Sequence, residues 1–155
     1  MKKITALIMT FVIVFMISSC GNKCFKNSKE DTVDYAKQNI GELKKTVDDI
    51  IEMQTSNNVS YGEFDYISYK KYPEYDFIQF SYDAQGMLGG QYWGIYYSSD
   101  NKAHGENGQN IELSEYGDGL AWIEQDGNNA YYTERIEGNW FFWYTDYDSR
   151  MFPDK

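Results

Sequence analysis

The sequence predicts an α+β fold, with one long N-terminal amphipathic helix packed on a twisted antiparallel meander sheet of about 5–7 strands. Two observations predict it. A single apolar stripe with helical spacing precedes position 56, and most of the 4 Trp, 15 Tyr and 9 Phe residues follow it. These later segments are short, aromatic and separated by Gly, Asn and Asp, which is typical of strands joined by turns.

The helix is predicted at about 29–55. Ser28 can cap its first turn, where Asp31 supplies an acid. Apolar residues then recur at spacings of three and four: Val33, Ala36, Ile40, Leu43, Val47 and Ile50. Gly41 weakens this helix by about 1 kcal/mol. The stripe could form a coiled-coil seam, but a single helix of this length more often packs on the protein's own sheet.

The sheet is predicted at about 63–147. Its strands are expected at about 63–70, 75–82, 87–98, 110–116, 120–126, 130–137 and 140–147. The residues Asp83-Ala84-Gln85-Gly86 fit a four-residue hairpin loop. Short connections favour neighbouring antiparallel strands.

A second hairpin predicts its own register. Gly138-Asn139 fits a two-residue type II′ turn, because glycine adopts the positive φ that the first turn position needs. That turn sets Glu137 opposite Trp140. It also sets Arg135 opposite Phe142 and Glu134 opposite Trp143.

Residues 1–19 are predicted to form a secretory leader that ends just before Cys20. Lys2 and Lys3 precede an uncharged apolar run that ends in Ser18-Ser19-Cys20. The sixteen uncharged residues from Ile4 to Ser19 fall short of the roughly 20 that a membrane-spanning helix needs. Two alternatives stay open: a single membrane-spanning helix, and an ordinary secretory leader that ends near a cysteine by chance.

The motif Ile17-Ser18-Ser19-Cys20 resembles the lipobox of bacterial lipoprotein precursors. The resemblance implies a signal peptide at 1–19 and a lipid-anchored tether at 20–27. The helix and strand patterns then predict a single α+β domain at 28–155. The resemblance also implies a diacylglycerol on the Cys20 thiol. The protein would then lie at the outer face of the bacterial cytoplasmic membrane, or at the outer membrane of a two-membraned cell. Cys24 would then have no disulfide partner within the chain. It would be a free thiol in the tether, or it would form a disulfide with another chain.

The charge of the chain excludes one class of partner. The 24 acidic residues outnumber the 14 basic ones, for a net charge of −10. Nucleic acid is therefore not expected, since its binding needs clustered Lys and Arg. Lys23, Lys26 and Lys29 follow the predicted anchor, where anionic head groups would attract them.

No catalytic or cofactor motif is present, and neither a cofactor nor a metal is expected. The only histidine, His104, lies in a polar loop and is expected at the surface, without a Gly-x-Ser-x-Gly motif to supply a nucleophile. Zinc lacks ligands. The loop from Asp100 to Ile111 fails as an EF-hand, because Ile111 stands where Glu is needed. An irregular calcium site near Asp118 or Asp126 stays open.

The aromatic strands carry the functional prediction. Tyr and Trp are the usual anchors of binding surfaces, and the candidate surface residues are Trp93, Tyr97, Trp140 and Trp143. We expect a non-enzymatic, membrane-anchored binding domain for a cationic peptide, a protein or a glycan of the envelope. Cross-strand packing that stabilises the sheet would explain the same residues. Two other functions stay open: an accessory subunit of an envelope assembly that docks through the helix stripe, and a small extracytoplasmic carboxylate enzyme.

Overall fold

The computed structural model describes residues 29–57, 59–82 and 91–147. The predicted leader, Cys20, Cys24, the tether and the hairpin loop at 83–86 lie outside these ranges. The elements are α2 (Lys29–Met53), β1 (Tyr66–Lys71), β2 (Asp76–Ser81), β3 (Gln91–Ser98), the short 3₁₀ helix η1 (Glu106–Gly108), β4 (Ser114–Tyr116), β5 (Gly119–Ile123), β6 (Ala130–Glu137) and β7 (Trp140–Asp146). Within the described ranges, no helix is long and apolar enough to cross a membrane.

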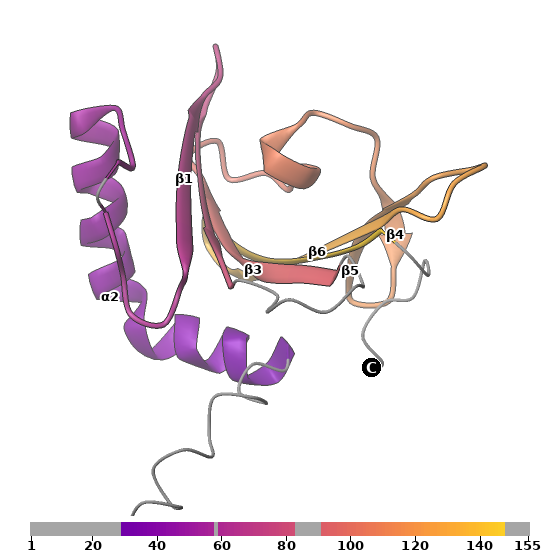
Figure 1. The fold of residues 1–155 in the computed structure, drawn as a ribbon, viewed down its shortest axis with the longest axis horizontal. Helices are drawn as coiled ribbons and strands as arrows, with labels where there is room; N and C mark the ends of the chain where they lie inside the picture. The colour runs from indigo at the N-terminus through magenta and orange to yellow at the C-terminus, as the bar shows by residue number, and fades with distance from the viewer. Residues whose placement is uncertain (1–28, 58, 83–90, 148–155) are drawn as a thin grey trace, which may run out of the picture.

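The seven strands form one antiparallel sheet in the order β1-β2-β3-β7-β6-β5-β4 (Figure 1). Strands β1–β3 form one meander and β4–β7 form another, and the two meet where β3 pairs with β7. The predicted α+β class is confirmed, with the meander divided into two halves. Residues 99–113, which connect the two meanders, are called the cover loop below.

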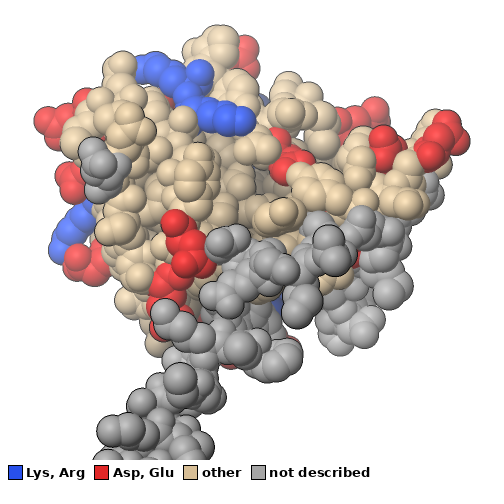
Figure 2. Space-filling view, in the orientation of Figure 1, with Lys and Arg blue, Asp and Glu red and all other residues tan. Residues whose placement is uncertain are grey.

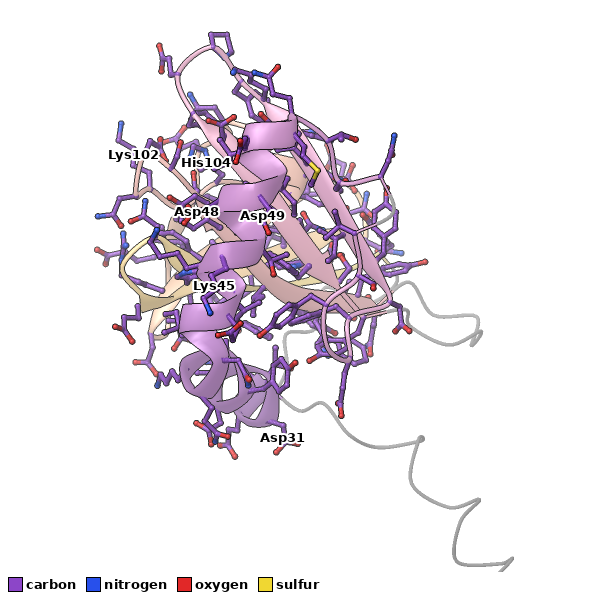
Figure 3. All side chains as sticks on the ribbon, turned by 90° about the vertical axis from the view of Figure 1, so that its left-hand side faces the viewer. Asp31, Lys45, Asp48, Asp49, Lys102 and His104 are labelled. Carbon is purple, nitrogen blue, oxygen red and sulfur yellow. The ribbon has the colours of Figure 1, made fainter. Side chains whose placement is uncertain are left out.

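Helix α2 packs on one face of the sheet, the helix face. The predicted stripe is its buried side: Leu43, Val47 and Ile50 are fully buried. Figure 1 shows that the helix bends near its middle and so follows the curved sheet. Gly41, the residue of lowest helix propensity in α2, lies in that region. Figure 3 shows the opposite, charged side of the helix, with Lys45, Asp48 and Asp49 turned away from the sheet.

The two halves of α2 cover different strands. The C-terminal half packs against a cluster formed mainly by β1, β2 and β3, with Trp140 of β7: Ile67, Ile78, Phe80, Ile95 and Trp140. In the N-terminal half, Val33 packs on a second cluster from β5, β6 and β7: Ala121, Tyr132, Phe142 and Tyr144. Lys29 forms an ion pair with Glu134, which ties the start of the helix to β6. The helix thus holds both meanders on one side.

The cover loop packs on the other face of the sheet, called the loop face. The rings beneath it are Phe77, Tyr96, Tyr131, Phe141 and Trp143. Two tyrosine hydroxyls hold the loop in place: Tyr72 donates to the Asn107 carbonyl (2.8 Å) and Tyr75 to the Gly108 carbonyl (2.5 Å). Gly108 has a φ of 78°, and a Cβ there would lie 2.6 Å from the Phe77 ring. Only glycine fits this close approach.

The strands lie near their predicted positions, but β1 begins later than expected, at Tyr66, β5 ends earlier, at Ile123, and β4 is shorter. Residues 87–90, the predicted start of β3, lie outside the described ranges. Only Ser114–Tyr116 pair with β5, because residues 110–113 belong to the cover loop. Gly138 has a φ of 52°, the positive value that the predicted turn needs. Glu137 lies opposite Trp140, as expected.

The rest of the predicted β6–β7 register is wrong by one residue. A bulge between Arg135 and Glu137 places Arg135 opposite Phe141 and Glu134 opposite Phe142. The shift moves Arg135 to the loop face, because opposite residues of an antiparallel pair share a face. There its guanidinium lies 4.5 Å from the centre of the Phe141 ring, and Nη2 donates to the Asn101 carbonyl of the cover loop (3.0 Å).

Replacing Leu43 with alanine is expected to destabilise the protein by about 2–5 kcal/mol, because a fully buried leucine leaves a cavity between α2 and the sheet. Lys45→Ala, on the exposed side of the same helix, is the matched control and should change stability by less than about 0.5 kcal/mol. Chemical denaturation monitored by circular dichroism measures both. Equal stabilities for the two variants would contradict the packing of the stripe on the sheet.

Candidate functional site: an acidic and aromatic hollow

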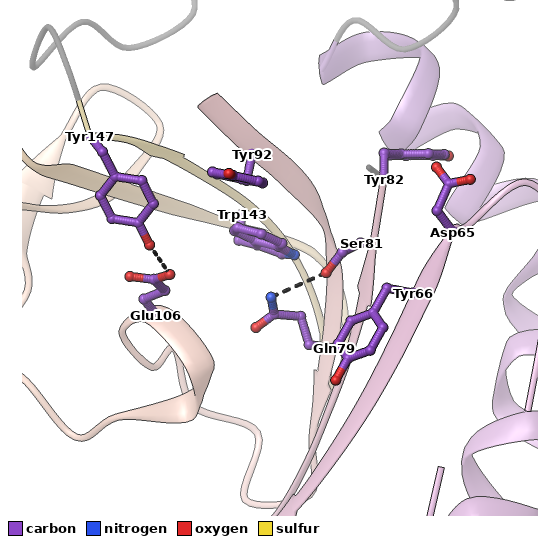
Figure 4. Close-up of a pocket in the computed structure, with 9 residues that line it drawn as sticks. All are labelled: Asp65, Tyr66, Gln79, Ser81, Tyr82, Tyr92, Glu106, Trp143 and Tyr147. Atoms are coloured by element: carbon purple, nitrogen blue, oxygen red, sulfur yellow. Dashed lines mark hydrogen bonds between the residues drawn. The ribbon is translucent and has the colours of Figure 1, made fainter. Parts of the chain in front are cut away.

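A hollow of about 550 Å³ opens on the loop face of the sheet (Figure 4). It is lined by nine residues from both meanders and the cover loop: Asp65, Tyr66, Gln79, Ser81, Tyr82, Tyr92, Glu106, Trp143 and Tyr147. Its volume lies within the range of roughly 300–1,000 Å³ that is common for small-molecule sites. This hollow is the candidate binding site.

The sheet register brings the middle of the lining together. Tyr66 pairs with Ser81, Ser81 with Gly94, and Gly94 with Trp143, so that these residues form one row across four strands. A Cβ on Gly94 would lie 2.0 Å from the Phe80 carbonyl oxygen and 3.0 Å from Nε1 of Trp143. The glycine therefore leaves room for the indole of Trp143 in the middle of the row.

The floor of the hollow contains buried polar groups. Gln79 is 7% exposed and Trp143 is 3% exposed. The amide nitrogen of Gln79 donates a hydrogen bond to the Ser81 hydroxyl (3.3 Å). Among the described residues, the buried indole nitrogen of Trp143 has no hydrogen-bond partner. Figure 4 shows this nitrogen on the side of the ring that faces Ser81 and Gln79.

Exposed tyrosines form the rim. Tyr66, Tyr92 and Tyr147 are 64%, 40% and 37% exposed, and the rings of Tyr92 and Tyr147 meet edge to face at 5.9 Å. The Tyr147 hydroxyl donates to the carboxylate of Glu106, which η1 carries. Burial and this hydrogen bond raise the pKa of Tyr147 well above its usual value of 10.0. Burial likewise raises the pKa of Tyr82.

The lining carries negative charge only. It includes the carboxylates of Asp65 and Glu106, and no Lys or Arg side chain among the described residues. Figure 4 shows the two carboxylates at opposite ends of the hollow, with Trp143 and Ser81 between them. They flank a ligand-sized space rather than converging on one reacting atom. On the face shown in Figure 2, acidic side chains are widely scattered, while the basic ones in view gather at the top and the left edge.

The four predicted aromatic residues do not form one exposed surface, and that expectation is wrong. Trp93, Tyr97 and Trp140 lie on the helix face, in or against the cluster that α2 covers. Trp140 is 5% exposed and packs edge to face on Tyr97 at 5.4 Å. Trp143 alone lines the hollow, from the opposite face. Which face a ring occupies depends on the pairing of the strands, and the sequence did not fix that pairing.

The other lining residues come from separate segments without a common spacing. One signal was nevertheless present in the sequence. In β2, the residues on the helix face are Ile78 and Phe80, whereas Gln79 and Ser81 alternate with them on the loop face. Polar residues on one face of an otherwise apolar strand indicate that this face is open at that end.

His104 is buried, which corrects the expectation of a surface histidine. It is 4% exposed and stacks on Tyr75, with ring centres 4.1 Å apart. Its Nε2 lies 3.1 and 3.2 Å from the carboxylate oxygens of Asp100. The sequence offered no sign of this burial, because the surrounding loop is polar and has no apolar period. The histidine holds the cover loop to the sheet.

Asp100 anchors the start of the same loop. Partial burial acts to raise its pKa, but hydrogen bonds from His104, Ser98 and the Lys102 backbone N–H outweigh that effect, and the pKa is lowered from the usual 3.8. The distance from the Ser98 hydroxyl is 2.7 Å. Among the described residues, no group of three or more His, Cys, Asp and Glu side chains is placed to hold a metal ion.

Asp100→Asn is expected to cost roughly 1–2 kcal/mol at pH 7, because hydrogen bonds to a charged acceptor are lost. A lowered folded-state pKa means that the stabilisation is fully present above about pH 4 and is lost as the pH falls through the folded pKa. The stability gap between the wild type and the variant should therefore shrink from pH 5 towards pH 2. Thermal melts across this range measure the gap. Asp49→Asn on the outer side of α2 is the control, and its stability difference from the wild type should not change with pH. A difference for Asp100→Asn that also stays constant from pH 5 to pH 2 would contradict the role of the Asp100 carboxylate.

Comparison with known proteins gives no assignment for this arrangement. No protein-family model matches the chain, and neither a curated protein nor a solved structure matches it. The function must therefore be inferred from the lining of the hollow and from the charge around it.

Proposed function

We propose that the protein is a non-enzymatic binding domain, held by lipid on Cys20 at the outer face of a bacterial membrane, and that the hollow binds a non-acidic ligand. One observation carries this proposal. The hollow combines exposed tyrosine rings at its rim with two carboxylates, and no basic side chain lines it among the described residues.

The electrostatics of the chain support the choice of ligand. Its net charge of −10 produces a field that repels anions over distances comparable to the Debye length. Inside the hollow, Asp65 and Glu106 add to that repulsion. A cationic or uncharged ligand meets no such barrier, and the rings of Tyr66 and Tyr92 offer it broad apolar surfaces.

The packing of α2 supports this proposal over an assembly subunit that docks through the helix stripe. Leu43, Val47 and Ile50 would have to be exposed for docking, and each is 0% exposed. The stripe is part of the protein's own core. The side of α2 that faces outward carries Lys45, Asp48 and Asp49, which do not form an apolar seam.

Charge selectivity at the hollow provides a direct test. Calorimetric titration of the full chain with hexalysine, with neutral and amine-bearing trisaccharides and with hexaglutamate should show binding of a non-acidic probe and none of hexaglutamate. Tyr92→Ala should weaken that binding about tenfold, as expected for an aromatic anchor. Tyr116→Ala is the matched control, since Tyr116 is 42% exposed against 40% for Tyr92 but lies on β4, away from the hollow.

Two results would overturn the proposed binding site. Either hexaglutamate binds as well as the other probes, or Tyr92→Ala and Tyr116→Ala weaken binding equally. The absence of binding by every probe would count against the proposed function as a whole.

The lipid anchor has its own test. Intact-mass measurement of protein from native cells should show the loss of residues 1–19 and the added mass of acyl chains, as the resemblance of Ile17-Ser18-Ser19-Cys20 to a lipobox implies. Cys20→Ala should abolish the added mass and release the protein from the membrane fraction, because two or three acyl chains are needed for stable anchoring. Cys24→Ala is the matched control and should keep both. An unmodified Cys20 in the wild type would refute the anchor.

A further inference from the structure

The floor of the hollow contains a buried hydrogen-bond donor, the indole N–H of Trp143, which bears on the chemical class of the ligand. Trp143 is 3% exposed and its indole N–H has no partner among the described residues, although it lies beside two polar side chains, Gln79 and Ser81. Buried donors in folded proteins are almost always paired, because an unpaired donor loses its hydrogen bond to water and gains nothing. Four buried polar atoms of the described residues lack a partner, and the indole nitrogen of Trp143 is the one whose residue lines the hollow, where a ligand could supply the acceptor.

The need for a hydrogen-bond acceptor distinguishes cationic ligands from ligands that carry hydroxyl groups. Lysine and arginine side chains carry hydrogen-bond donors but no acceptor, so a cationic peptide could pair the Trp143 N–H only through a backbone carbonyl. A hydroxyl group both donates and accepts. It can accept from the Trp143 indole and donate to a carboxylate of the same hollow.

The shape and charge of the lining add two further conditions. The exposed rings of Tyr66 and Tyr92 favour a ligand with an apolar face as well as polar edges. The carboxylates exclude ligands that carry carboxylate, phosphate or sulfate groups, because a like charge in a partly desolvated site is strongly unfavourable. A sugar ring has C–H faces and hydroxyl edges, and it satisfies all these conditions when it is uncharged or bears an amine.

We infer that the ligand of the hollow is an uncharged or amine-bearing carbohydrate, with one of its oxygens accepting a hydrogen bond from Nε1 of Trp143. This inference rests on the proposed function and names the ligand class for the same site. The sugar reaches the floor beside Gln79 and Ser81, while the tyrosines of the rim contact its ring.

The test uses the indole N–H signals of the full chain, prepared in a detergent without a sugar headgroup and labelled with ¹⁵N. The probes are cellotriose, mannotriose, chitotriose, the glucosamine trimer, a trimer of glucuronic acid and hexalysine. Binding of a neutral or amine-bearing trisaccharide should move the Trp143 indole proton downfield. Trp93 is the internal control, because its indole N–H is also buried and without a partner among the described residues but lies outside the hollow.

Substitution gives the second readout. Trp143→Phe keeps a ring and removes the donor, and it should weaken sugar binding by about fivefold, the factor that corresponds to one hydrogen bond. Trp93→Phe should leave the affinity unchanged. If Trp143→Phe does not fold, Gln79→Ala replaces it, since this amide lies beside the same floor and its loss should weaken binding by a similar factor.

The outcomes distinguish this inference from the proposed function. Binding of hexalysine without any sugar overturns the carbohydrate assignment and leaves the proposed binding domain standing. Binding of the glucuronic acid trimer as tightly as cellotriose overturns the charge argument for the sugar class. Sugar binding that leaves the Trp143 signal unmoved, or moves Trp93 equally, overturns the placement of the ligand at the floor. Failure of all probes overturns both proposals.

Discussion

The central strands of the sheet carry apolar side chains on both faces, and this constraint governs the whole fold. Every residue of β7 from Trp140 to Asp146 is buried, including Phe141 on one face and Phe142 on the other. A sheet of this kind is stable only when both faces are covered. Helix α2 covers one face and the cover loop covers the other, so that the position of each follows from the same strands.

The two covers differ in their chemistry. Helix α2 uses an apolar stripe whose burial follows directly from the hydrophobic effect. The cover loop is polar and uses specific contacts: the hydroxyls of Tyr72 and Tyr75, the stacked His104 and the close approach of Gly108 to Phe77. It does not extend over the whole loop face. The hollow lies where the cover ends, between Glu106 of the loop and the strands next to it.

The sequence predicted the elements better than their faces. The helix stripe and the aromatic strands have local periods, and the structure has them where they were expected. Register is different, because one bulge near Ile136 moves Arg135 from one face to the other without leaving a sign in the composition. For the same reason the sequence could not separate Trp140, which α2 covers, from Trp143, which lines the hollow. Burial of His104 also depends on a non-local contact.

The cover loop has two roles that become linked through Glu106. It shields the rings of the loop face, and it supplies one wall of the hollow. Transient detachment of this loop from the sheet would therefore dismantle the wall while α2 and its own side of the sheet stay in place. A molecule held in the hollow would slow that detachment, since binding stabilises the closed form over the locally opened one. Amide protons of residues 99–113 would thus report occupancy through slower exchange with solvent, even though most of them lie away from the hollow itself.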